Sequence, residues 1–188
     1  YLNTYYGGDR QLLKSADGVF VARPRERIAL ERYYLYPDSR IHTVPYGIEI
    51  GDLATRERSD ELRKSLGIPE TAKVVATASE MHETEEVINL LRAFEHVVIK
   101  KPNTRLLIVG QGPKFKEIER AMLDLALGGK VVLTGAIKDT DLPDYIALAD
   151  VLVNLSSRTT GFEPSLLEAM AQKKVIVGSE VSPMGTIV

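Results

Sequence analysis

Apolar positions along residues 74–178 follow two alternating spacings. Short, nearly continuous apolar runs stand at residues 74–78, 105–109, 131–133, 151–155 and 174–178. Between these runs, apolar residues recur every three or four positions, which is the period of a helix with one buried face. Buried strands that alternate with such helices form a parallel sheet covered on both sides. The pattern therefore predicts an α/β fold with five strands after residue 70, in a Rossmann-like, doubly wound parallel sheet.

Four helices are expected between these strands. They cover residues 83–101, residues 115–125 with a stop at the glycine pair 128–129, residues 142–149, and residues 164–171. Asp139 or Thr140 is placed to cap the third helix. Pro164 suits the first position of the fourth helix, because the N–H that proline lacks would have no helical partner there.

The first 70 residues predict a smaller βα unit and a connection. A helix is expected around residues 11–13, a strand at 18–22, a helix from Pro24 to Tyr34 and a strand at 41–44. Residues 51–70 read as a connection with a short charged helix that starts near Ser59 and ends at Gly67. Its basic residues alternate with acidic ones, which indicates a solvated, mixed-charge face. The predicted division is 1–50, 51–70 and 71–188.

Composition excludes several classes of protein. Of 188 residues, 44% are hydrophobic and 27% are charged, which is typical of a folded globular chain. The net charge of −2 gives no electrostatic reason to bind nucleic acid. The absence of cysteine excludes disulfides and thiolate metal sites, and three scattered histidines argue against a histidine-rich one. No apolar run reaches the ~20 residues of a transmembrane helix. The chain starts at Tyr1 without a signal-peptide pattern, so we expect a fragment, with the cytoplasm as the default location.

The topology itself nominates a site. Ligands of doubly wound sheets bind outside the carboxyl ends of the strands, where the strand order reverses. With the usual order 3-2-1-4-5, loops 79–86 and 156–163 meet at this point. The amides and positive dipole end of the helix that starts at Pro164 would favour an anion there. The polar residues nominated in this way are Ser79, Glu80, His82, Glu85, Ser156, Arg158, Thr160, Gly161 and Glu163, with Glu168 behind them. The simpler alternative is an ordinary sheet helix with a solvated Glu168.

A glycine-rich turn at residues 110–113 (GQGP) is a weak indication of dinucleotide binding. It follows the second strand of the unit, lacks a third glycine at the right spacing and has Pro113 where a free backbone donor is needed. A tight strand-to-helix turn explains it well.

Taken in order, several segments resemble the retaining GT-B glycosyltransferases of the large group that contains sucrose-, glycogen- and mannosyl-type transferases (family 4). Residues 43–49 (TVPYGIE) resemble the family's P-N-G-V-D segment. The other matching segments are 91–94 (LRAF), 106–113 (LLIVGQGP), 132–135 (VLTG), 149–153 (ADVLV) and 161–171 (GFEPSLLEAMA). The similarity runs from about Val19 to the end of the chain.

The resemblance implies two Rossmann-like domains with the active site between them. Residues 1–50 would be the tail of the first domain. Residues 71–188 would be most of the second, which binds the donor, without its C-terminal closing segment. Glu168 matches the second of two glutamates eight positions apart and would hold the donor ribose. Gly161, Phe162, Ser165 and Leu166 would line the donor site, with amides from Gly161 to Leu166 facing its diphosphate. No metal or other cofactor is expected.

Four positions depart from the family pattern. The first glutamate of the pair, which contacts the donor sugar, falls on Thr160, and Glu163 stands three residues later where the family has glycine. Thr160 and Glu163 are therefore the candidate catalytic positions. The phosphate-binding Arg and Lys of the family fall on Glu80 and Glu85. A like charge ~5 Å from a phosphate costs on the order of 3 kcal/mol at an effective dielectric near 20. Arg158 and Lys138 are the nearby cations that could compensate.

Three functions remain open. The first is a glycosyltransferase that moves a sugar from a nucleotide sugar to a sugar, lipid or protein acceptor, with this fragment inactive alone. Peripheral membrane contact would come through the rest of the first domain. The second is a glycosyltransferase-like binding or scaffolding subunit that has lost catalysis, as Thr160, Glu80 and Glu85 suggest. The third is an NAD enzyme, which lacks its glycine fingerprint after the first strand, at residues 78–81.

Overall fold

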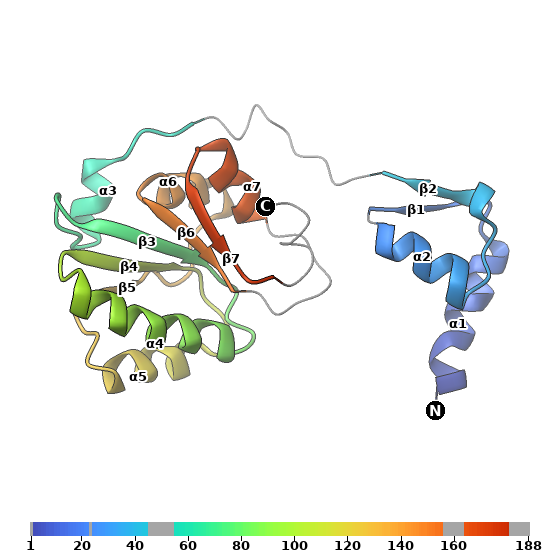
Figure 1. Ribbon diagram of the computed structural model, residues 1–188, viewed down its shortest axis with the longest axis horizontal. Coiled ribbons are helices and arrows are strands. Elements are labelled where there is room, and N and C mark those ends of the chain that lie inside the picture. Colours follow the sequence, from blue (N-terminus) through green and yellow to red (C-terminus); the bar gives the residue numbers. More distant parts are fainter. Residues whose placement is uncertain (1, 23, 45–54, 156–163, 181–188) are drawn as a thin grey trace. The chain divides into compact units, whose positions relative to one another are not determined.

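The protein forms two compact units, residues 1–49 and 50–188, in a computed structural model that describes residues 2–22, 24–44, 55–155 and 164–180 (Figure 1). The smaller unit contains α1 (Leu2–Ser15), β1 (Val19–Val21), α2 (Pro24–Tyr33), the 3₁₀ turn η1 (Asp38–Arg40) and β2 (Ile41–Thr43). Strands β1 and β2 pair in parallel, with Val19 opposite Ile41. The predicted elements of this unit are confirmed.

The larger unit alternates strands and helices as expected. Its elements are α3 (Asp60–Ser65), β3 (Lys73–Ala78), α4 (Glu85–Lys100), β4 (Thr104–Val109), α5 (Phe115–Asp124), β5 (Val131–Leu133), η2 (Asp139–Asp141), α6 (Leu142–Ala147), β6 (Val151–Asn154), α7 (Pro164–Ala171) and β7 (Val175–Gly178). The five strands are parallel in the order β5-β4-β3-β6-β7. This is the predicted 3-2-1-4-5 order, so it reverses between β3 and β6.

Two apolar clusters cover the two faces of this sheet. One packs α4 and α5 against strands β3, β4 and β5, with Phe94, Leu106 and Ile118 almost fully buried. The other packs α6 and α7 against the opposite face, around Leu107, Leu152 and Ala169. Figure 1 shows α4 and α5 together on one side of the strands, away from α6 and α7. The near-continuous apolar strands are explained by this coverage on both faces.

Helix ends follow the predicted chemistry in one case and depart from it in another. Ser59 caps α3 by accepting a hydrogen bond from the Leu62 N–H at 3.1 Å, and the turn after α3 contains Gly67 at a φ of +65°. The expected cap of α6 by Asp139 or Thr140 is wrong. Both residues lie in the preceding 3₁₀ turn, and the Thr140 hydroxyl donates to the Asp141 carboxylate instead.

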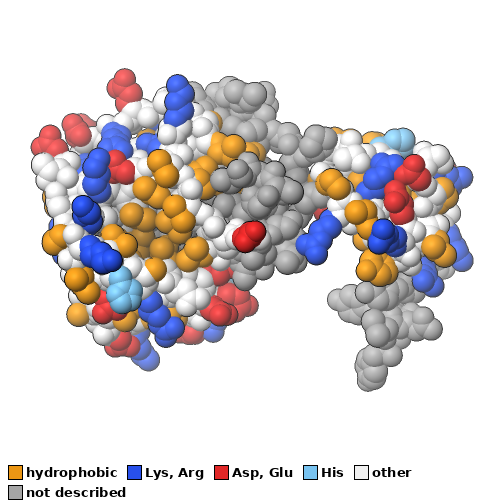
Figure 2. All heavy atoms as spheres, viewed as in Figure 1, with side chains coloured by type: hydrophobic (Ala, Val, Ile, Leu, Met, Phe, Trp, Pro, Cys, Tyr) orange, Lys and Arg blue, Asp and Glu red, His pale blue; other side chains and the backbone are white. Residues whose placement is uncertain are grey.

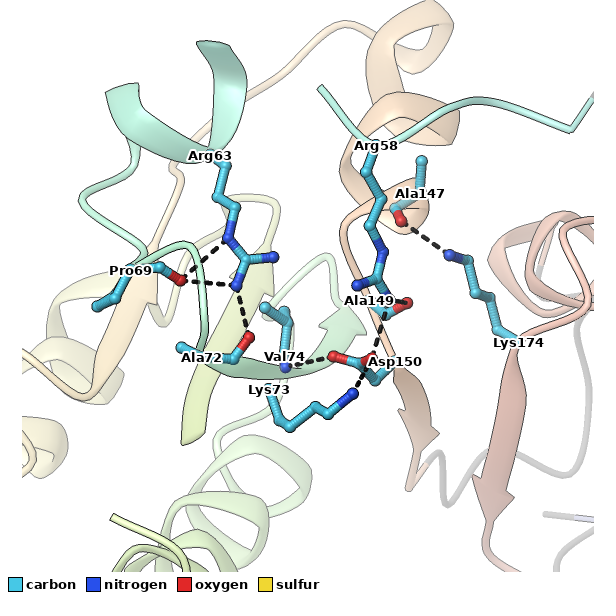
Figure 3. Close-up of polar contacts among 10 residues, drawn as sticks. All are labelled: Arg58, Arg63, Pro69, Ala72, Lys73, Val74, Ala147, Ala149, Asp150 and Lys174. Carbon is cyan, nitrogen blue, oxygen red and sulfur yellow. Dashed lines mark hydrogen bonds and ion pairs between the residues drawn. The ribbon is translucent and has the colours of Figure 1, made fainter. Parts of the chain in front are cut away.

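A polar network joins the amino ends of the central strands (Figure 3). The Asp150 carboxylate accepts hydrogen bonds from the Val74 N–H at 2.9 Å, from Arg58 at 2.9 Å and from Lys73 at 3.2 Å. Burial alone would raise the pKa of Asp150, but these hydrogen bonds outweigh it and lower the pKa. Asp150 therefore ties the segment before α3 to β3 and β6.

The expectation of a solvated face at residues 56–64 is wrong for one of its residues. Arg63 is buried, and its guanidinium donates to the carbonyl oxygens of Pro69 and Ala72 (Figure 3). These carbonyls belong to the turn that leads from α3 into β3. A planar guanidinium with several fixed donors can satisfy both, which the alternation of charges did not reveal.

Candidate functional site

A pocket of about 530 Å³ opens at the carboxyl ends of the strands, around the point where the strand order reverses. Strands β3, β4 and β6, the loop after β5, and helices α4, α6 and α7 contribute lining residues. Its lining residues are Thr77, Ala78, Ser79, Glu80, Glu86, Val87, Leu90, Val109, Gly110, Gln111, Ala136, Ile137, Asp139, Leu142, Asn154, Leu155, Ser165 and Glu168. This is the place that topology predicts for a ligand.

Two glycines let the loops on one side of the pocket pack backbone against backbone. A Cβ on Gly110 would overlap the carbonyl oxygen of Ser79, and one on Gly112 would overlap that of Glu80. Gly110 also has a φ of +120°, which side chains disfavour. The interpretation of residues 110–113 as a tight turn rather than a dinucleotide fingerprint fits this packing.

Hydrogen bonds fix the same loops to the next one. The Ala136 N–H donates to the Gln111 side-chain oxygen at 3.0 Å, and the Gly110 N–H donates to the Thr134 hydroxyl oxygen at 3.1 Å. The Lys114 N–H donates to the Met81 carbonyl at 3.0 Å. Contacts among three loops, at residues 79–81, 110–114 and 134–136, therefore preorganise this side of the pocket.

Glu168 lies in the pocket on α7, in the second turn after Pro164. One of its carboxylate oxygens is buried and has no hydrogen-bond partner within the part of the chain that the structure describes. Burial raises the pKa of Glu168, and the negative charge of Asp139 raises it further. An acceptor left without a partner in a pocket is matched to a ligand that brings hydroxyl or amide donors.

The charges of the described lining are all acidic. They are Glu80, Glu86, Asp139 and Glu168, and no Lys or Arg lines the pocket over the described ranges. His82 lies beside one of them, with its Nε2 3.2 Å from a carboxylate oxygen of Glu80. An anionic ligand therefore needs positive groups from outside this lining.

The structure places the predicted site residues as follows. Glu80, Ser165 and Glu168 line the pocket together. Glu85 is the first residue of α4 but does not line it, whereas its neighbour Glu86 does. Lys138 is exposed between two lining residues, and Leu166 is buried outside the lining. Arg158, Thr160, Gly161, Phe162 and Glu163 lie outside the described residues, so their positions stay predictions.

Five polar lining residues were not individually predicted as site residues: Thr77, Glu86, Gln111, Asp139 and Asn154. Gln111 follows β4 and Asp139 follows β5, and these two strands lie beyond β3 on one side of the switch point. Both residues could have been predicted from the rule that the carboxyl ends of all parallel strands share one edge of the sheet. The prediction used this rule only for the two loops next to the switch point. Asn154 is a buried polar residue at the end of β6. Its position within an apolar run was the sequence feature that could have indicated a site residue.

The described ranges lack two features, a membrane-spanning helix and a metal-binding cluster. None of their helices is long and apolar enough to cross a membrane. No group of three or more His, Asp or Glu side chains in them could hold a metal ion.

Comparison with known proteins identifies the family. The sequence model of the family described as "Glycosyl transferases group 1" matches residues 58–188, which is well over half of the chain. The chain belongs to this family. One curated relative of the chain is alpha-monoglucosyldiacylglycerol synthase of Streptococcus pneumoniae. The two sequences are 26% identical over 173 residues, and the match covers 89% of this chain and 38% of that protein.

A second curated relative is N-acetyl-alpha-D-glucosaminyl L-malate synthase of Bacillus anthracis, 28% identical over 68% of this chain and 32% of that protein. The chain thus spans less than half the length of these relatives. Among solved structures, Anabaena HepE in complex with UDP-glucose matches all of this chain and 52% of its own, with a TM-score of 0.80 at 20% identity. This likeness confirms the predicted fold, a Rossmann-like sheet as found in GT-B glycosyltransferases.

Proposed function

We propose that this chain provides the nucleotide-sugar-binding part of a glycosyltransferase that moves a sugar from a nucleotide sugar to an acceptor, with retention at the anomeric carbon. Residues 1–49 would be the tail of the first Rossmann-like domain. The observation that carries the proposal is a buried carboxylate oxygen of Glu168 that has no hydrogen-bond partner among the described residues, in the switch-point pocket of a group 1 glycosyltransferase.

Glu168 would hold the ribose of the donor. The two vicinal hydroxyls of a ribose are donors that one carboxylate can accept together, and charge-assisted hydrogen bonds of this kind are strong. Binding would give the buried oxygen a partner, which it lacks among the described residues of the free protein. This would account for a glutamate at a place where burial opposes its charge.

The diphosphate would lie toward the start of α7. Amides from Gly161 to Leu166 and the positive end of the helix dipole would face it, together with Arg158 and Lys138. Such groups stabilise the charge that develops on the leaving diphosphate as the glycosidic bond breaks. Thr160 and Glu163 remain the proposed positions next to the transferred sugar, and no metal is assigned.

A second candidate function is a glycosyltransferase-like subunit that binds without catalysing. The four carboxylates of the described lining favour it, because a diphosphate dianion near Glu80 meets repulsion in place of attraction. The two functions differ in turnover and not in fold. Both predict a ligand in the same pocket.

Ligand-dependent stability tests donor binding. Thermal unfolding of the chain is measured with UDP, GDP and ADP, their sugars and the monophosphates, with and without Mg²⁺. A ligand at a hundredfold over its Kd should add about 2.7 kcal/mol. We expect one base to stabilise the wild type, Glu168→Ala to lose this effect, and Glu117→Ala, on the exposed side of α5, to retain it. Absence of any response in a folded sample would refute donor binding.

Transfer activity separates the two candidates. It is measured on the polypeptide that also carries the acceptor-side residues, because we expect residues 1–188 alone to be inactive. Sugar transfer that is lost in Glu168→Ala or Glu163→Ala supports the enzyme. Nucleotide binding with no transfer to any sugar, lipid or protein acceptor supports the binding subunit. A cytoplasmic location and the absence of a nucleic-acid partner remain expectations.

A further inference from the structure

The smaller unit contains a hollow of about 450 Å³ that the proposed function does not use. One side is formed by α1 and the other by the chain between α2 and β2. Its lining residues are Arg10, Leu13, Lys14, Tyr34, Leu35, Tyr36, Pro37 and Arg40. Since α1 ends just before β1 and Arg40 directly precedes β2, the hollow lies at the amino ends of the paired strands.

Tyrosine hydrogen bonds hold the two sides of this hollow together. The Tyr36 hydroxyl donates to the Ala16 carbonyl at 3.0 Å, and the Tyr34 hydroxyl donates to the Asp9 carboxylate at 3.0 Å. Leu35 between them has a φ of +53° and is 82% exposed. A non-glycine residue in this conformation persists only where its surroundings impose it. The hollow is therefore a preformed feature.

The charged residues of the hollow are all cationic. Arg10 and Lys14 stand four positions apart on one face of α1, where like charges repel, and Arg40 adds a third positive charge from the opposite side. Lys14 also complements the dipole at the end of α1, but this does not account for the other two. Asp and Glu are absent from the described lining. The nearby Asp38 is paired with Arg27, and Asp9 accepts from Tyr34.

The existing contacts leave these cations available. Over the described ranges, Arg10 makes one long hydrogen bond, 3.4 Å, to the Tyr33 carbonyl, and all three side chains belong to exposed residues. Figure 2 shows Lys and Arg side chains spread over the visible face of this unit. A bound anion would relieve the repulsion within the group, and arginine forks suit the paired oxygens of a phosphate.

We propose that this hollow binds a phosphate-bearing ligand, held by Arg10, Lys14 and Arg40 against the walls of Tyr34 and Tyr36. The site consists of other residues than the pocket around Glu168, and it does not depend on the proposed function. The phosphate comes from a soluble ester or from a lipid headgroup. The exposed side chain of Leu35 beside the cations is compatible with either source.

Residue-resolved NMR tests the site on the whole chain. Sodium pyrophosphate is titrated at constant ionic strength, and backbone amide shifts are followed. We expect amides of residues 10–14 and 34–40 to shift together. Lys14→Gln with Arg40→Gln should raise the Kd at these amides at least about tenfold, the effect of losing one charge-assisted hydrogen bond. Arg32→Gln removes an exposed cation outside the hollow and should leave the Kd unchanged.

A vesicle arm separates the two sources. The same proteins are sedimented with vesicles of phosphatidylcholine, with and without phosphatidylglycerol. Pyrophosphate shifts without vesicle binding identify a soluble ester. Binding to phosphatidylglycerol vesicles that the double variant loses and Arg32→Gln retains identifies a headgroup. If wild type shows neither response, or if the double variant, with an otherwise unchanged spectrum, matches wild type, the site does not exist.

Discussion

Replacement of Glu168 by glutamine should stabilise the free protein while it weakens ligand binding. The buried oxygen of Glu168 has no partner over the described ranges, and the carboxylate is partly desolvated. Glutamine would leave the same atom without a partner but would remove its charge, and a buried polar atom without a partner costs ~1–3 kcal/mol, more when it is charged. The side chain is only partly buried, so we expect a gain near the low end, about 1 kcal/mol in the free energy of unfolding at pH 7. For a chain of this size this raises Tm by about 2–4 °C.

The pH dependence of this gain has a definite sign. Burial and Asp139 raise the pKa of Glu168, so the folded state holds the proton more tightly than the unfolded chain. The stability that protonation contributes is complete below the unfolded value of about 4.3 and is lost as pH rises through the folded pKa. The advantage of Glu168→Gln should therefore be largest at neutral pH and disappear at about pH 4.

Urea unfolding of both proteins between pH 4 and pH 8 measures this effect, and titration with the nucleotide found in the thermal screen measures binding. Losing about 2 kcal/mol of ribose hydrogen bonding should weaken binding about thirtyfold. Glu117→Gln, which removes only an exposed ion pair with Lys114, should change neither quantity by more than about 0.5 kcal/mol. A Glu168→Gln protein that is less stable at pH 7 than wild type would show that the carboxylate has a structural role, contrary to this reasoning.

Three further predictions concern the scaffold. Asp150→Asn should cost about 2 kcal/mol at pH 7, because the carboxylate accepts from an amide and two cations. Since the pKa of Asp150 is lowered in the folded state, the difference in free energy of unfolding between wild type and variant should shrink as pH falls below about 4. A difference that stays constant down to pH 3 would show that the carboxylate charge is not its cause. Gly112→Ala should cost about 3 kcal/mol or more in urea unfolding, since its Cβ would overlap backbone, whereas Gly128→Ala, which meets nothing, should be neutral. Arg63→Lys should lower the free energy of unfolding by about 2 kcal/mol, because an ammonium replaces a planar guanidinium that donates to two carbonyls. Equal melting curves of variant and wild type would refute this.

The fold was predictable because its signals are local and repeated. Each strand of the larger unit is a short apolar run, and each helix has a 3.6-residue period that ends at glycine or a loop. Once the elements alternate, the right-handed crossover leaves few topologies, and the 3-2-1-4-5 order is the commonest of them. The cap of α6 was missed because two residues suited to capping wind into a 3₁₀ turn one step earlier.

The site was predictable in place and only partly in composition. The switch-point rule located the pocket, and Glu80 and Glu168, two of the nominated residues, line it. The choice between Glu85 and Glu86 depends on where α4 begins, and helix ends are poorly specified by pattern alone. Asp139 and Gln111 enter the pocket through the lateral packing of loops that lie far apart in sequence.

By itself, the sequence determined the order of the elements, the five parallel strands and the edge of the sheet where the pocket opens, because periodicity, glycine and apolar runs act over short distances. Only the tertiary structure decided which charges meet. It placed four carboxylates around one pocket, buried Arg63 over two carbonyls and brought Arg40 opposite Arg10 and Lys14. Charge energies depend on burial and on distances between remote segments. Those quantities exist only once the chain has folded.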